Sequence, residues 1–283
     1  MKKMLVPTDF SVFAQNALQV AFQLARKTEA DITLLHIVPP LQKLLLAPEP
    51  ITGDNGLEAI LLNQVRKYAE KQLADTLQKQ AYPPEKIHLL VQTGDIAPAI
   101  VQMARDIEAN MIVMGTQGTR PIEEIWVGSN AEKVVLLAPC PVLTVRDQPQ
   151  NFIMAKILFP TDLKKVSPGA ISHLREFQRL TDAHLHLLYI NSRYGFLSQE
   201  EIERRKAHFV LEHHIENYTF HTLAAWREES GILMMAQKLE VDLIALITHQ
   251  RQGLSRFFLG STAEDVVNHS QRPVLTLGAN LLA

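Results

Sequence analysis

The sequence has only one cysteine and two tryptophans among 283 residues, and it contains no long apolar run. The single thiol, Cys140, cannot form an internal disulfide, which is typical of a protein from a reducing compartment. It lies in the apolar stretch APCPV, so we expect a small buried packing residue rather than a reactive thiol. No stretch reaches the roughly 20 apolar residues of a membrane span, and the apolar residues after Met1 are too few for a signal peptide. We therefore expect a cytoplasmic protein.

An excess of charge of one sign is also lacking. Lys and Arg number 28 and Asp and Glu number 30, which leaves a net charge of −2. This balance argues against nucleic acid or an anionic membrane surface as a partner, because either would favour a basic face. The sequence also lacks the phosphate loop Gly-x-x-x-x-Gly-Lys-Ser/Thr, and no Gly-x-Gly-x-x-Gly follows the first predicted strand. These absences exclude a P-loop NTPase and a standard dinucleotide dehydrogenase.

What the sequence does contain is an internal repeat. The stretch Met4–Phe10 recurs as Ile157–Leu163, with an offset of 153 residues. Pro141–Thr144 recurs as Pro273–Thr276, but there the offset has fallen to 132, so the second copy is 21 residues shorter. The loss falls between the second and fourth predicted strands of that copy. The sequence therefore predicts two tandem domains, at residues 1–147 and 152–283.

Each copy alternates short apolar runs with helical patterns. The aliphatic run Asp31–Val38 is typical of a strand covered on both sides, and apolar residues after Ser11 have the spacing of one helix face. Ser11 is a candidate N-cap, and Ser167 with Pro168 supplies a cap and a first-turn proline in the second copy. We predict an α/β fold in which each domain is a Rossmann-like, five-stranded parallel sheet with helices on both faces. In the first copy the predicted strands are 3–8, 31–38, 86–92, 111–114 and 142–145.

A glycine-rich segment follows the fourth predicted strand, with Gly115, Gly118 and Gly128 in the spacing Gly-x2-Gly-x9-Gly. Ligands of doubly wound sheets bind beyond the carboxyl ends of the strands, where the strand order reverses. Glycines let the backbone approach a ligand closely, and a helix that begins at Asn130 would offer free N–H groups to an anion. The pattern favours the phosphates of a nucleotide, with Asp9 across the cleft as an acceptor for ribose or adenine. A surface connection without a ligand is the alternative.

Several separated motifs, taken together, resemble the universal stress proteins in their tandem form. They are VPTD at 6–9, LLHI at 34–37, TGD at 93–95, the glycine pattern, and PCPVL at 139–143. The resemblance covers nearly the whole chain and implies an adenine nucleotide alpha hydrolase-like fold that binds ATP, with Mg²⁺ as a candidate companion. By matching position it implies ribose and adenine contacts from Pro7, Thr8, Asp9 and Ile37, and ribose and phosphate contacts from Gly115, Gly118, Gly128, Ser129 and Asn130.

The same resemblance implies how the two copies assemble. Family members pair their last strands in a dimer, so a tandem chain should pair Val142–Val145 with Val274–Leu277 internally, as a pseudo-dimer. A further homodimer of whole chains stays open, and the sequence names no protein partner.

The second copy departs from the glycine pattern. Ile247 and Gln250 stand at the positions of Gly115 and Gly118, although Asp162 is retained. We expect these larger side chains to obstruct the second pocket, which leaves one nucleotide site, in the first half. The second half is then a structural partner or a sensor of something else. Binding of an anion by Arg251 and Arg256 is the alternative.

The sequence predicts neither a catalytic nor a metal site. Nine of the eleven histidines lie in the second copy, but no zinc-ligand spacing accompanies them, so we expect scattered surface residues. No base stands beside a nucleophile in the first cleft, so any ATP hydrolysis should be slow. Two functions follow: an ATP-binding regulatory or stress-response protein, or a nucleotide-independent interaction or scaffold module. An adenylating enzyme would need a pyrophosphate-handling motif that is not visible.

Overall fold

The computed structural model describes residues 1–40, 55–77, 82–116, 130–146, 154–192, 196–248 and 261–278. The elements of the first half are β1 (Lys3–Pro7), α1 (Val12–Thr28), β2 (Asp31–Val38), α3 (Asn55–Leu77), a 3-10 turn (Pro84–Lys86), β3 (Ile87–Thr93), α4 (Ile96–Asp106), β4 (Met111–Gly115), α5 (Asn130–Leu137) and β5 (Val142–Val145). Those of the second half are β6 (Lys156–Pro160), α6 (Pro168–Thr181), β7 (His184–Ser192), α7 (Gln199–Glu212), β8 (Tyr218–Ala225), α8 (Glu228–Lys238), β9 (Leu243–Thr248), α9 (Ser261–His269) and β10 (Val274–Gly278).

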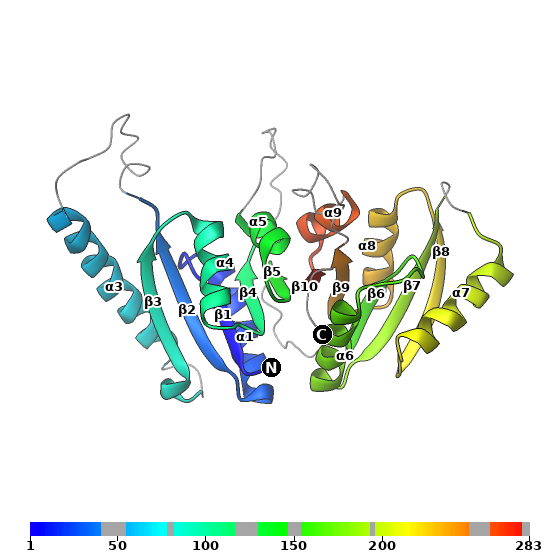
Figure 1. The fold of residues 1–283 in the computed structure, drawn as a ribbon, viewed down its shortest axis with the longest axis horizontal. Helices are drawn as coiled ribbons and strands as arrows, with labels where there is room; N and C mark the ends of the chain where they lie inside the picture. Colours follow the sequence, from blue (N-terminus) through cyan, green and yellow to red (C-terminus); the bar gives the residue numbers. More distant parts are fainter. Residues whose placement is uncertain are drawn as a thin grey trace.

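The strands form one ten-stranded sheet in the order β3-β2-β1-β4-β5-β10-β9-β6-β7-β8 (Figure 1). Neighbouring strands are parallel within each half, as predicted. The two halves meet at β5 and β10, which pair antiparallel with Leu143 opposite Leu275. The α/β class, the parallel sheets and the internal pairing of the two last strands are therefore confirmed. The predicted domain boundary at 147–152 lies outside the described residues and stays a prediction.

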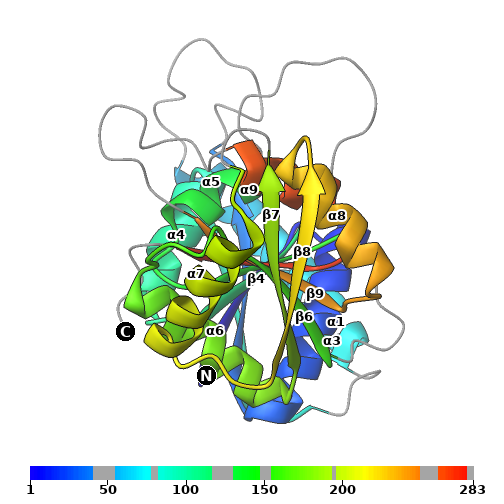
Figure 2. The ribbon, with the colours of Figure 1, turned by 90° about the vertical axis from the view of Figure 1, so that its right-hand side faces the viewer.

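The helices form a layer on each face of this sheet. Helices α1, α6 and α7 pack on one face, where a single hydrophobic core runs through both halves. Helices α4 and α5 cover the other face of the first half, and α8 and α9 cover that of the second. Figure 2 shows α7 and α8 on opposite sides of β7 and of β8, which is an edge strand. The burial of both faces explains the continuous aliphatic runs of the central strands.

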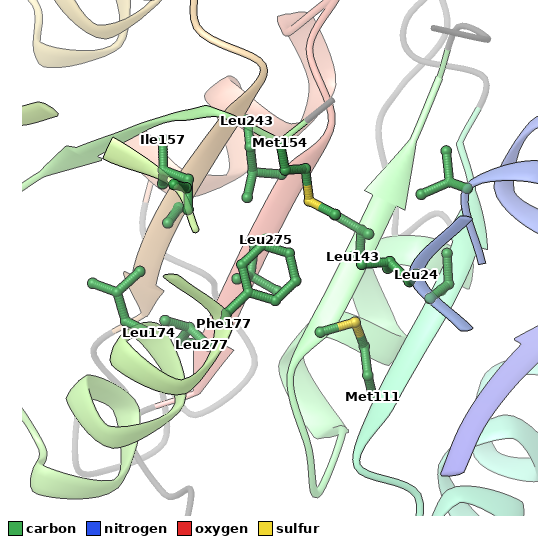
Figure 3. Close-up of a cluster of buried hydrophobic side chains, with 14 of the residues drawn as sticks. Leu24, Met111, Leu143, Met154, Ile157, Leu174, Phe177, Leu243, Leu275 and Leu277 are labelled. Carbon is green, nitrogen blue, oxygen red and sulfur yellow. The ribbon is translucent and has the colours of Figure 1, made fainter. Parts of the chain in front are cut away.

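The core crosses the junction between the halves without a break. Figure 3 shows Met111 and Leu143 of the first half facing Leu275 and Phe177 of the second, with Met154 between them. All five side chains are at most 3% exposed. Burial of apolar surface is the main favourable term in folding, so this shared core holds the two halves as one body.

The start of each half's first helix shows how local sequence sets local structure. The Ser11 hydroxyl accepts a hydrogen bond from the Ala14 N–H at 3.2 Å, which confirms the predicted cap of α1. Ser167 holds the N-cap position of α6, with Pro168 in the first turn, but its side chain makes no capping bond. Its ψ is 129°, against 163° for Ser11, so the prediction of a serine side-chain cap was wrong there.

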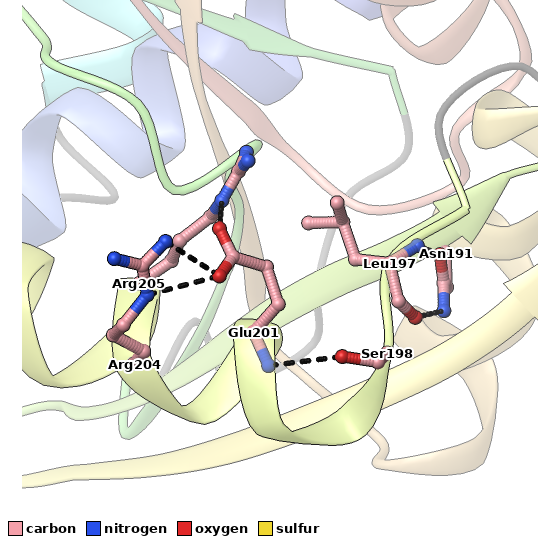
Figure 4. A network of polar contacts seen from close by, with 6 residues as sticks. All are labelled: Asn191, Leu197, Ser198, Glu201, Arg204 and Arg205. Carbon is pink, nitrogen blue, oxygen red and sulfur yellow. Dashed lines mark hydrogen bonds and ion pairs between the residues drawn. The ribbon is translucent and has the colours of Figure 1, made fainter.

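The connection after β7 shows where the second half is shorter. The Asn191 side chain donates to the Leu197 carbonyl and accepts from the Leu197 N–H, both at 2.9 Å, and Ser198 caps α7 through Glu201 (Figure 4). The Glu201 carboxylate then accepts from Arg205. Helix α7 has 14 residues whereas α3 has 23. The shorter helix and this short connection contribute most of the missing length.

The expectation for Cys140 can also be compared with the structure. Cys140 is buried, and that burial raises the pKa of its thiol to about 12, so it is the unreactive packing residue that was predicted. His213 and His214 lie beyond α7, which ends at Glu212, and His214 has φ 49°. In the part of the chain that the structure describes, no helix has the length and hydropathy to cross a membrane.

Candidate functional site

A cavity of about 360 Å³ opens beyond the carboxyl ends of β1, β2 and β4. It lies where the strand order reverses around β1, the usual position of a ligand in such a sheet. Its size falls within the range of small-molecule sites. The described lining residues are Pro7, Thr8, Asp9, Ser11, Phe13, Ala14, Leu35, Ile37, Ile96, Ile100, Met114, Gly115, Thr116, Asn130, Ala131 and Asn268.

One rim of the cavity is the tight turn between β1 and α1. Thr8 Oγ1 accepts from the Phe10 N–H and Asp9 Oδ1 accepts from the Ser11 N–H, both at 3.0 Å. Phe10 adopts a left-handed conformation, with φ 63°. These bonds fix the Asp9 side chain at the mouth of the cleft, where it is exposed. Its second carboxylate oxygen has no partner among the described residues, so it is available to accept from a ligand.

A second wall is apolar. Leu35 and Ile37 reach it from β2, Ile100 from α4 and Met114 from β4, and each is at most 8% exposed. Ile96 belongs to the same wall and packs against the same core. Such a wall suits the flat, largely apolar face of a purine ring. Of this wall, only Ile37 was predicted from the sequence; the four-residue spacing of Ile96 and Ile100 in the helix after the TGD motif could have identified these two as well.

The third side is the first turn of α5, which begins at Asn130 as predicted. Asn130 and Ala131 both line the cavity. The first N–H groups of a helix lack intrahelical partners and lie at the positive end of its dipole, so this end of the cavity favours an anion. The apolar wall that suits a purine and the start of α5 that favours an anion therefore lie on different sides of one cavity.

Gly115 lines the cavity, but the structure also gives it a packing role. A Cβ at Gly115 would lie 2.5 Å from the Phe13 carbonyl carbon and oxygen and 2.7 Å from the Ala14 nitrogen. These are backbone atoms of α1, which cannot yield as a flexible side chain can. Only glycine therefore permits this close approach of β4 and α1, whether or not a ligand is bound.

Six of the nine predicted ligand residues line the cavity: Pro7, Thr8, Asp9, Ile37, Gly115 and Asn130. The other three, Gly118, Gly128 and Ser129, lie outside the described residues. Asn268, which reaches this cavity from the second half, was not among the predicted residues.

The second half repeats the turn but surrounds it differently. Thr161 accepts from the Leu163 N–H and Asp162 from the Lys164 N–H, each at 3.1 Å, and Leu163 has φ 58°. However, the Lys164 ammonium also lies 3.1 Å from the second Asp162 oxygen. The second oxygen of Asp162 is thus ion-paired, whereas that of Asp9 has no partner among the described residues, although the exposure of the Asp162 pair weakens it.

The mouth of the second cleft carries a further negative charge. Glu228 stands at the position of Ile96, and its carboxylate accepts from the Thr262 hydroxyl at 3.3 Å, close to the start of α9. A carboxylate there would repel an incoming phosphate. Ile247, at the position of Gly115, packs against the core under α6. Helix α6 begins at Pro168, three residues later than α1 does by the repeat offset, which leaves the room that this side chain needs.

The histidines of β7 and β8 gather at the opposite, amino end of the strands. His186 Nδ1 and His221 Nε2 are 3.0 Å apart, and the rings of His184 and His186 are 4.9 Å apart. Burial, followed by the neighbouring His184 and His221, lowers the pKa of His186 to about 4. In the described ranges, no three His, Cys, Asp or Glu side chains converge as metal ligands. The expected scatter of histidines was therefore wrong for these three.

Comparison with known proteins gives a consistent result. The model of the universal stress protein family matches residues 1–146 and 154–277. A universal stress protein of Synechocystis sp. is 24% identical over 98% of this chain and 99% of that protein, and one of Bacillus subtilis is 29% identical over 51% of this chain and 98% of that protein. The crystal structure of a universal stress protein from Archaeoglobus fulgidus shares the fold, with a TM-score of 0.74 and 20% identity over 98% of this chain and 96% of that one.

Proposed function

We propose, since this chain belongs to the universal stress protein family, that it is a regulatory or stress-response protein that binds ATP at one site, in its first half. The observation that carries the proposal is the cavity beyond β1, β2 and β4, in which one apolar wall, one exposed carboxylate and one helix start converge. An adenine nucleotide has the matching parts: a flat base, ribose hydroxyls and an anionic tail.

In the proposed complex, the adenine lies on the apolar wall that includes Ile37 and Ile100. Asp9 accepts from ribose hydroxyls or from the adenine amino group, beside Pro7 and Thr8. The phosphates lie at the start of α5, near Asn130 and Gly115, with Gly118, Gly128 and Ser129 assigned to them by the family pattern. We expect Mg²⁺ to bind through the phosphates, because Asp9 is the one carboxylate in the described lining.

We propose binding rather than catalysis as the role of this site. In the described lining, no His, Lys, Cys or Tyr stands beside the hydroxyls of Thr8, Ser11 or Thr116 to act as a base. Hydrolysis of ATP would then be slow and incidental. We assign the protein to the cytoplasm. A homodimer of whole chains would need an edge other than β5 or β10, since these strands pair with each other.

A nucleotide-independent interaction or scaffold module is the second candidate. The packing of Gly115 against α1 favours this candidate, because the fold itself requires a glycine at this position of the motif, with or without a ligand. The two candidates differ in what the rest of the glycine pattern is for.

Substitution within that pattern distinguishes them. We expect ATP to raise the melting temperature of the wild-type chain but not of Gly118→Val, because added ligand stabilises only a fold that binds it. Gln250→Val, at the matching position of the second half, is the control and should respond as the wild type does. No ATP-dependent rise in the wild type would reject the nucleotide site and favour the scaffold, whereas an equal rise in all three proteins would mean that ATP binds without the glycine pattern of the first half.

A further inference from the structure

One polar residue in the wall of the first cavity belongs to the second half of the chain. Asn268, in the last turn of α9, lines the same cavity as Asn130 and Ala131 in the first turn of α5. The remaining described lining residues all come from the first half. This cavity is therefore built by both halves.

The pairing of the two last strands explains how Asn268 arrives there. Strands β5 and β10 run antiparallel, and each is preceded by the helix that packs on the same face of the sheet, α5 or α9. The two helices consequently run in opposite directions, side by side above the junction (Figure 1). Ala263 of α9 packs against the cores under both helices, which confirms the contact. The last turn of α9 thus lies beside the first turn of α5.

The antiparallel pairing of β5 and β10 also places the last turn of α5 towards the second cleft, but the residue at the matching position is different there. Leu136 stands at the position of Asn268 by the repeat offset, and it packs against the apolar core of its own half. The start of α9 is instead occupied by the contact between Glu228 and Thr262. The first cleft thus has a carboxamide from the other half where the symmetry gives the second cleft an aliphatic side chain.

We propose that Asn268 is a specificity residue of the first cleft, whose amide N–H groups donate to the phosphates of a bound nucleotide. This inference rests on the ATP site proposed above. Asp9 is the one charged residue in the described lining, so the donors that this lining offers to an anion are neutral. Asn130 and Asn268 are the two carboxamides in that lining, one from each half, and the half-buried Asn268 lines the same cavity as the first turn of α5.

A composite wall has a regulatory consequence. A nucleotide that bonds to both Asn130 and Asn268 would tie α9 to α5, and so would couple occupancy of the first cleft to the contact between the halves. The second half then serves as part of the binding site, beyond the structural role that its own altered cleft suggests.

Calorimetric titration of the full chain with ATP and with adenosine tests this proposal. Asn268→Leu introduces the residue found at the matching position of α5, and it should weaken ATP binding about tenfold and adenosine binding less than about twofold. Asn268→Asp keeps the shape but adds a negative charge, so it should weaken ATP binding further. His269→Gln is the control: it changes the same helical turn, outside the cavity, at a residue paired with Glu229 at 3.1 Å, and should leave both affinities unchanged.

The outcomes separate this inference from the function on which it rests. If wild-type protein and Asn268→Leu bind ATP equally well, the role of Asn268 is rejected and the ATP site stands. If the wild type binds no ATP, the proposed function is rejected and the role of Asn268 with it. The side-chain amide signals of Asn268 in the NMR spectrum of the wild type give a second readout that needs no variant to fold. They should shift when ATP is added, and unmoved signals during saturation would contradict the proposal.

Discussion

The turns after β1 and β6 are built by the same hydrogen bonds, yet the clefts above them differ in charge. Asp9 has a free carboxylate oxygen in the described structure, whereas Lys164 lies 3.1 Å from the second oxygen of Asp162. Ile96 stands in the first cleft where Glu228 stands in the second. The two copies have thus kept the backbone geometry of this turn, while the side chains that would meet a nucleotide have changed. Retention of a fold and of a turn does not imply retention of a ligand.

The largest contrast should come from adding one methyl group to a glycine in each half. Gly115→Ala should lower the free energy of unfolding by about 2–3 kcal/mol, because its Cβ would lie 2.5 Å from α1 backbone atoms. Gly231→Ala should change it by less than about 1 kcal/mol, since its nearest neighbour at 2.8 Å is the flexible end of Ile190 and alanine favours the helix. Urea unfolding followed by circular dichroism measures both. Equal losses would reject the packing role of Gly115.

The second prediction concerns the stability of the fold at acid pH. His186 and His221 share a close nitrogen contact, and burial lowers the pKa of both, that of His186 to about 4. Positive charge on His184, Lys156 and Lys238 acts in the same direction. The folded protein then binds fewer protons than the unfolded chain, so stability is full above pH 6.5 and falls as the pH drops towards 4. We expect a loss of about 2 kcal/mol over that window, after allowance for solvent screening.

The first half supplies the matched change for this test. Thr33 stands at the position of His186 by the repeat offset, so His186→Thr transfers the residue of one half to the other. The variant should lose much of the pH dependence between 6.5 and 4 in urea unfolding measured across that range. A wild-type protein whose stability stays constant over this window would contradict the account of the histidine pair.

Removal of the aspartate from each turn compares how the two clefts contribute to nucleotide binding. Asp9→Ala should weaken binding of both ATP and adenosine about tenfold, because it removes an acceptor for ribose or adenine. Asp162→Ala removes the same turn bond in the second half, at 3.1 Å, and should alter either affinity less than about twofold. Calorimetric titration compares the two. Equal effects would show that the turn acts through stability and not through contact with the ligand.

The smallest contrast lies at the helix caps. Ser11→Ala removes the bond to the Ala14 N–H and should cost about 1 kcal/mol of stability. Ser167→Ala removes no capping bond and should cost less than about 0.5 kcal/mol. Thermal unfolding of both variants beside the wild type is sufficient. A larger loss from Ser167→Ala would mean that its hydroxyl has a role that the structure does not show.

Much of this fold could be predicted from the sequence, because periodicity and repetition report directly on sheets and helices. The bounds of β2 and β5 agree with the prediction residue for residue, and the internal pairing of β5 with β10 was expected from the family pattern. Contacts between distant segments could not be predicted in this way. Asn268 reaches the first cavity only because α9 runs antiparallel to α5, and no local pattern in α9 indicates it.

The reasons for individual residues were also less predictable than their positions. Gly115 was expected to make room for a ligand, yet its Cα lies against the backbone of α1, a packing constraint that spacing alone cannot reveal. Ile247 was expected to fill the second pocket, and it packs against the core under α6 because that helix begins later. In both cases the neighbouring helix, which is far away in the sequence, decides what the residue does.

The number of ATP molecules bound per chain tests the central asymmetry most directly. Titration of the freshly purified, nucleotide-free full chain with ATP should give one site per chain, and Asp9→Ala should weaken that one site. Two equivalent sites per chain would contradict the distinction between the halves, and a single site that is lost in Asp162→Ala but not in Asp9→Ala would place it in the wrong cleft.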